Sequence, residues 1–109
     1  MKKPAARAAI LRSAAAAAAI AALSSSLTAA ESGNAVRGAR LYTTVGCYQC
    51  HGTVGQGSLV TGPRLAPNPA PLEFYMVVLR RPPNVMPAYS QKVLPDQDIA
   101  DIHAYLSSL

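Results

Sequence analysis

The chain has 109 residues, half of them apolar, and a formal net charge of +5. This length and composition exclude an intrinsically disordered chain and a protein with several large cores, and they fit one small domain. The positive charge alone would favour a nucleic-acid partner, but its distribution along the chain argues against that interpretation.

The first thirty residues have the pattern of a secretory signal peptide. Four basic residues and no acid precede a run of ten apolar residues from Ala14, and the small residues Thr28 and Ala30 then stand before Glu31. A membrane-spanning helix is the alternative, but it needs about 20 apolar residues. We therefore predict that residues 1–30 are a cleaved signal peptide, that the protein is exported to the periplasm, and that 31–109 form the mature domain.

The mature part of the chain is nearly neutral. Removing the four basic residues of the leader from the ten leaves six, against five acidic residues. We therefore expect no nucleic-acid partner and, after cleavage, no membrane-spanning segment. A domain of this size has a marginal hydrophobic core, which a disulfide, a metal or a cofactor usually reinforces.

Residues 35–44 are predicted to form the first helix of the domain. Asn34 can cap its start, and apolar residues recur through Leu41 and Val45. Gly38 lowers the stability of such a helix, so either a close packing contact or an exposed turn has to explain it.

Both cysteines lie in the sequence GCYQCHG, residues 46–52, which spaces them as Cys47-x-x-Cys50-His51. A disulfide would close too short a loop to stabilise the fold much. Thiol exchange is typical of a βαβ unit, and no strand pattern precedes this motif. A zinc site needs four ligands, and these three residues are too close together to face one ion with only His103 remaining.

Covalent haem attachment accounts for all three residues of the motif. Two thiols at this spacing can add to the two vinyl groups of a haem, and the adjacent imidazole can then bind the iron. The sequence therefore predicts one covalently attached haem c, with Cys47 and Cys50 forming the thioethers and His51 as an iron ligand.

Residues 53–71 are rich in glycine and proline and are predicted to form a loop. Residues 72–80 follow as a short helix that ends before two prolines. Because this helix is apolar nearly all round, we expect it to be buried on the haem side as a lid.

Residues 95–109 give the clearest helix pattern in the chain. Ile99, Ile102, Leu106 and Leu109 recur at helical spacing and form one apolar stripe. The remaining candidates for a second iron ligand are Met76, Met86 in a proline-rich loop, and His103, whose default interpretation is a solvated residue at the edge of this stripe.

Taken together, the motifs resemble the small class I cytochromes c, a mono-haem cytochrome c family. The resemblance covers nearly all of residues 35–109 and rests on four stretches that occur in the family's order: GARLYTTVGCYQCHG, TGPRLAP, NVMPAY and DQDIADIHAYLSSL. It implies an all-α, cytochrome c-like fold with three to four short helices wrapped around one covalently bound haem. It also implies that Gly38 and Tyr42 meet Tyr105 where the first and last helices cross.

The resemblance further implies the roles of three residues around the haem. The carbonyl of Pro63 accepts the Nδ1 proton of His51, Leu65 touches the haem face, and Met86 is the second axial ligand of the iron. In this interpretation both faces of the iron are occupied, so the protein carries electrons and is not an enzyme.

The sequence thus predicts a periplasmic one-electron carrier that cycles haem between Fe(II) and Fe(III). It either diffuses freely or is the small haem subunit of a periplasmic oxidoreductase complex, and its partners are redox proteins: a dehydrogenase, an oxidase or another cytochrome. The near-neutral charge slightly favours a dedicated partner, because it gives little electrostatic steering. Two alternatives stay open, a five-coordinate gas sensor or peroxidase if Met86 does not bind iron, and a haem-free thiol oxidoreductase.

Overall fold

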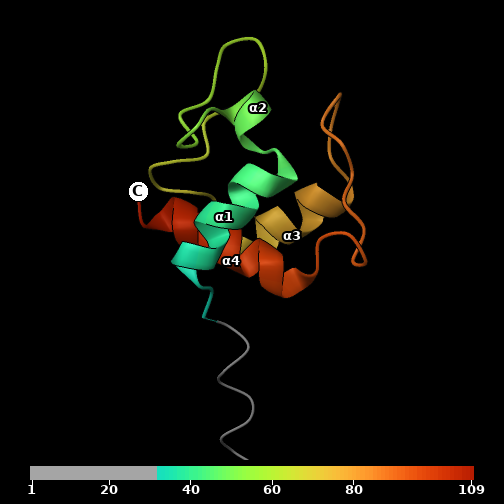
Figure 1. Cartoon of the computed structure of the whole chain (residues 1–109). Coiled ribbons are helices and arrows are strands. Elements are labelled where there is room, and N and C mark those ends of the chain that lie inside the picture. Colours follow the sequence, from blue (N-terminus) through green and yellow to red (C-terminus); the bar gives the residue numbers. More distant parts are fainter. Residues whose placement is uncertain (1–31) are drawn as a thin grey trace, which may run out of the picture.

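A computed structural model describes residues 32–109, and this part of the chain folds into four helices joined by loops (Figure 1). The helices are α1 (Ala35–Val45), α2 (Tyr48–His51), α3 (Leu72–Arg80) and α4 (Asp96–Ser107). The predicted all-α class is therefore confirmed. The predicted signal peptide lies outside the described residues, so its cleavage stays a prediction. No helix within the described range has the length and apolar character required to cross a membrane.

Local interactions explain where helix α1 begins and ends. The side chain of Asn34 accepts a hydrogen bond from the backbone N–H of Arg37 at 2.9 Å, as expected for an N-cap. Gly46 ends the helix with φ of 93°, a left-handed conformation that glycine adopts without strain. This turn redirects the chain from α1 into the short helix α2.

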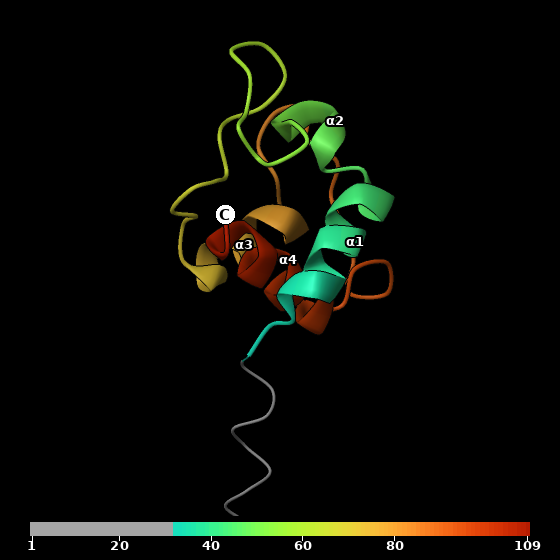
Figure 2. The same ribbon diagram turned by 60° about the vertical axis from the view of Figure 1, so that its left-hand side comes forward.

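Helix α1 packs across α4, as both views of the ribbon show (Figures 1 and 2). Gly38 lies at the crossing, and a Cβ atom there would stand only 1.8 Å from the carbonyl oxygen of Asp101. Close packing, and not an exposed turn, therefore explains this glycine. The rings of Tyr42 and Tyr105 meet beside it with centroids 5.6 Å apart, which confirms the expected aromatic contact at the crossing.

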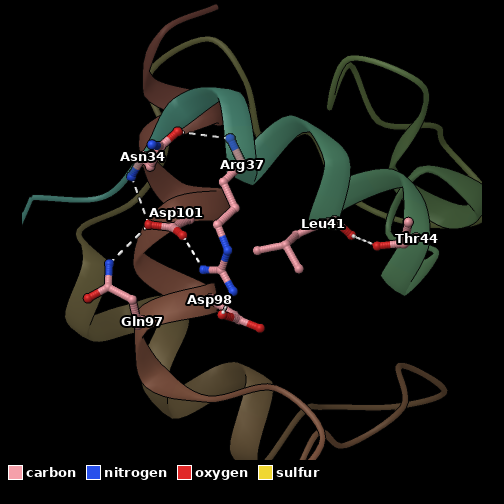
Figure 3. A network of polar contacts seen from close by, with 7 residues as sticks. All are labelled: Asn34, Arg37, Leu41, Thr44, Gln97, Asp98 and Asp101. Atoms are coloured by element: carbon pink, nitrogen blue, oxygen red, sulfur yellow. Dashed lines mark hydrogen bonds and ion pairs between the residues drawn. The ribbon is translucent and has the colours of Figure 1, made fainter.

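A buried carboxylate joins the start of α1 to α4 (Figure 3). Asp101 is 1% exposed and accepts hydrogen bonds from the backbone N–H of Asn34 at 2.7 Å and from the Gln97 side chain at 3.0 Å. Arg37 pairs with Asp101 and also with Asp98, the latter at 2.6 Å. The carboxylate thus has partners for its lone pairs, which removes the cost of burying an unpaired charge.

The core forms where α4 meets α1 and α3. Ile99, Ile102 and Leu106 are at most 3% exposed, and full burial of each such side chain is worth about 1.5–3 kcal/mol. The apolar stripe was predicted to continue to Leu109, but its buried part ends at Leu106. Helix α4 stops at Ser107, and Leu109 is half exposed.

Helix α3 packs one of its faces into the core. Tyr75 and Leu79, four residues apart, are buried in the core, but Phe74 and Val77 are 58% and 64% exposed. The prediction that this helix is buried on the haem side as a lid stays a prediction. One face packs inward and the other faces solvent, because helix periodicity puts Phe74 and Val77 away from the Tyr75–Leu79 side.

Candidate functional site

Helix α2 is a single turn that carries the cysteine–histidine motif. Cys47 stands at its N-terminal end, with its backbone N–H bonded to the Tyr42 carbonyl at 3.1 Å, and Cys50 and His51 lie within the turn. Both cysteines are free thiols, Cys47 partly buried and Cys50 exposed, whereas His51 is 8% exposed. The turn therefore presents two unpaired thiols and turns the imidazole inward.

The ring of His51 is oriented by the backbone of the following loop. Its Nδ1 atom lies 2.8 Å from the carbonyl oxygen of Pro63, and since a carbonyl only accepts, Nδ1 donates the proton. Gly62 passes so close that a Cβ atom there would lie 3.0 Å from the ring. The hydrogen bond expected with Pro63 is thus present, and it leaves Nε2 as the nitrogen with a free lone pair.

Further hydrogen bonds hold the loop of residues 52–66 around α2. The N–H of Gly57 donates to the His51 carbonyl at 2.7 Å, and the Thr61 hydroxyl donates to the Cys50 carbonyl at 2.7 Å. These bonds satisfy carbonyl groups at the end of a helix that is too short to satisfy them itself. The loop therefore holds the motif through the carbonyls of both Cys50 and His51.

Two further contacts link this loop to the core. The hydroxyl of Tyr42 donates to the Gly52 carbonyl at 2.7 Å from a side chain that is 1% exposed. Leu65 is partly buried against the core, and its N–H donates to the Gly55 carbonyl at 2.7 Å. These contacts fix the position of Leu65 within the loop that follows His51. Its contact with a haem face stays a prediction.

The Cys47 thiol does not have the character of a thiol-exchange nucleophile. Burial raises its pKa to about 11, whereas reactive cysteines of thiol oxidoreductases have lowered pKa values. A zinc site is not supported either, because residues 32–109 contain no group of three histidine, cysteine or acidic side chains placed to hold a metal ion.

The loop between α3 and α4 brings Met86 and Tyr89 to the same region. Tyr89 is partly buried against the core; this burial raises its pKa, and negative charge on Cys47 and Cys50 would raise it further. Met86 is partly buried against the core. Its ligation of the iron stays a prediction.

His103, the other candidate ligand, has a structural role instead. Its Nε2 atom lies 2.8 Å from the Ala70 carbonyl oxygen, and its ring meets Tyr75 edge-on with centroids 5.1 Å apart. The expectation of a solvated flanking residue is wrong, because the end of the proline-rich loop and α3 both pack against this part of α4. The contact occupies one of the two ring nitrogens that can bind a metal.

A family model for subunit III of cbb3-type cytochrome c oxidase matches residues 33–106. The chain belongs to this family of cytochrome c domains. The match spans the first three helices, α4 except for its last residue, and the cysteine–histidine motif, and it confirms the resemblance to mono-haem cytochromes c. No individual curated protein and no solved structure matches the chain significantly.

Cytochrome c domains of this type carry out haem-based electron transfer and are typically not enzymes. The donor set around α2 of this cytochrome c domain fits a haem c: two free thiols for the vinyl groups, and an imidazole with Nδ1 already hydrogen-bonded and Nε2 free. Gly62 adds room beside the ring that a side chain would fill. The Cys-x-x-Cys-His motif and this geometry thus agree on covalent haem attachment.

Sequence reasoning missed the residues that hold this cytochrome c site in place. Thr61 and Tyr42 donate hydrogen bonds to carbonyls of the motif, and Arg80 donates hydrogen bonds to the loop between α3 and α4, which carries Met86. Their partners lie nine to eleven residues away along the chain, so no local pattern marks them. The sequence did indicate that Tyr42 lies at the crossing of the first and last helices. No sequence pattern indicated a structural role for Thr61 or Arg80.

Proposed function

We propose that the mature chain is a periplasmic one-electron carrier with a single haem c, bound covalently through Cys47 and Cys50. His51 and Met86 are its axial iron ligands, and Pro63 and Leu65 pack beside it. The observation that carries this proposal is the His51 Nδ1–Pro63 hydrogen bond, which presents Nε2 of a buried imidazole next to two free thiols.

A bound haem supplies the reversible Fe(II)/Fe(III) couple that carries one electron. The residues of this chain hold and orient it: the thioethers keep it in place during repeated docking, and the Pro63 carbonyl strengthens His51 as a donor. Met86 would hold the iron together with His51, and its thioether would raise the reduction potential relative to a second histidine and exclude small molecules from the iron.

The near-neutral mature charge favours a dedicated partner over a freely diffusing carrier. We therefore favour the role of a small haem subunit, or a carrier with one partner, next to a periplasmic dehydrogenase, an oxidase or another cytochrome. Cell fractionation with N-terminal sequencing tests the location: we expect the periplasmic form to begin at Glu31. A full-length cytoplasmic protein would contradict it.

The ligands are tested by optical spectra of protein exported from a host that attaches haem. We expect a low-spin ferric spectrum with a sulfur-to-iron band in the far red, which disappears in Met86→Ala. Met76→Leu is the matched control and keeps the band, because Met76 lies within α3. A wild type that is already high-spin and binds carbon monoxide rapidly would instead support a five-coordinate sensor or peroxidase, and protein without haem would support a thiol oxidoreductase.

A further inference from the structure

The loop that carries Met86 has little to hold it in its first half. Within the described residues, no hydrogen bond joins residues 82–88 to another segment. Asn84 adopts a left-handed conformation with φ of 53°, and Val85 is 94% exposed. In Figure 1 this orange chain extends beyond the helices and returns to α4. Besides the packing of Met86 against the core, the position of this residue depends on how the two ends of the loop are fixed.

One side chain fixes the returning end. Arg80, the last residue of α3, donates from Nη1 to the carbonyl oxygens of Tyr89 at 2.9 Å and Leu94 at 2.7 Å. Its Nη2 atom donates to the side chains of Gln91 and Asp96, the latter at 2.6 Å. A single guanidinium thus joins four acceptors distributed over the loop's second half and the start of α4.

The geometry of this contact requires arginine. The guanidinium is planar and offers several donors in a fixed fork, whereas a lysine ammonium is a point charge on a flexible stem. The Arg80 side chain is 24% exposed, so its bonds to carbonyls are partly shielded from water and are charge-assisted. The backbone N–H of Tyr89 adds a bond to the Leu79 carbonyl at 2.8 Å, which places the anchored section three residues after Met86.

We propose that Arg80 is a positioning residue for Met86. By fixing the returning end of the loop against α3 and α4, it limits the excursions of the Met86 sulfur and so slows its exchange for external ligands. This inference rests on the proposed function, because it takes Met86 as the sixth ligand of the iron.

The test compares Arg80→Lys with Arg81→Lys in the haem-loaded protein. Arg81 is exposed, and its side chain forms no hydrogen bond within the described part of the chain, so it is the matched control. The measurement is the association rate of imidazole with the ferric protein, at a temperature well below unfolding. We expect Arg80→Lys to raise this rate about tenfold, the factor that follows from losing one charge-assisted hydrogen bond, and Arg81→Lys to leave it unchanged. The far-red band should also be lost at a lower pH in Arg80→Lys.

The outcomes separate this inference from the proposed function. A wild type with a Met86-dependent band, and equal imidazole rates in all three proteins, would overturn the role of Arg80 and leave the proposed function standing. A wild type without that band would overturn both. A lowered melting temperature with an unchanged imidazole rate would show that Arg80 only stabilises the fold, which also overturns the inference.

If Arg80→Lys does not fold, Asp96→Asn replaces it. This change weakens one acceptor of the same contact on a carboxylate that is 60% exposed. We expect a smaller rise in the imidazole rate in the same direction, and no rise would overturn the role of Arg80.

Discussion

Gly38 is the residue on which the approach of α1 to α4 depends. A Cβ atom at this position would overlap the Asp101 carbonyl oxygen, so Gly38→Ala has to push the two helices apart. We expect a loss of about 1–3 kcal/mol in the free energy of unfolding, as for other overpacked sites, even though alanine favours helix formation. Urea denaturation checks this.

Arg40→Ala is the control for the Gly38 experiment. Arg40 lies in the same helix and is exposed, so alanine there should change the unfolding free energy little. Equal stability of Gly38→Ala and Arg40→Ala would mean that the helices are not in such close contact.

The hydroxyl of Tyr42 gives a second test at the scale of one atom. Tyr42→Phe keeps the ring at the helix crossing but removes the 2.7 Å bond to the Gly52 carbonyl. We expect this change to cost about 1 kcal/mol of unfolding free energy, as is typical of one buried hydrogen bond. Tyr105→Phe is the matched variant, because the Tyr105 hydroxyl donates no hydrogen bond within the described residues. The prediction fails if both variants lose the same amount.

Among the helices, the junction of α1 and α4 should respond to acid through Asp101. Burial by itself raises the pKa of this carboxyl, but hydrogen bonds from Asn34, Gln97 and Arg37 outweigh it, so the pKa lies below its ordinary value. Near that pKa the unfolded state binds more protons than the folded state. The stabilisation from Asp101 is therefore present above the unfolded pKa of about 4 and is lost as the pH falls through the lower folded value.

The variant Asp101→Asn tests this linkage. We expect it to lower the unfolding free energy at neutral pH by about 1.5–3 kcal/mol, the range for hydrogen bonds to a charged group, and to flatten the fall in stability below about pH 4. Denaturation curves at several pH values measure both effects. Glu73→Gln, an exposed acid in the first turn of α3, is the control, and an acid dependence of Asp101→Asn as steep as wild type would contradict the assignment.

The helices show which features a sequence can predict. The start of α1, the core stripe of α4 and the cysteine–histidine turn depend on residues close together in the chain, and they were found by spacing and capping. The face of α3 that packs into the core could not be predicted, because apolar residues surround that helix and periodicity does not single out one face. The hydrogen bonds of His103 and Arg80 were not predicted, because only tertiary packing brings their acceptors within reach: the Ala70 carbonyl for His103, and the loop that carries Met86 for Arg80.

For the molecule as a whole, the small size of the domain predicts dependence on its cofactor. A core built on so few residues is marginal, and ligands that bind only the folded state stabilise it. We expect the double variant Cys47→Ala, Cys50→Ala to lack covalent haem and to melt at a lower temperature than the haem-loaded protein.

Circular dichroism melts of the wild type, the double variant and Cys50→Ala measure this effect. Cys50→Ala keeps one thiol and serves as the intermediate case, since one thioether can still hold the haem. A double variant that melts as cooperatively and at the same temperature as the wild type would show that the protein core suffices by itself.

The hydrogen bond from the Asn34 backbone N–H to Asp101 also determines where the chain enters the domain. This contact lies at the start of α1, while α2 follows the other end of that helix (Figures 1 and 2), and an eleven-residue helix spans about 16 Å. A fusion partner or surface tether joined ahead of residue 32 would therefore be attached at the end of α1 remote from the cysteines. Immobilised on an electrode in this way, the protein would present α2 and its two cysteines to the solution.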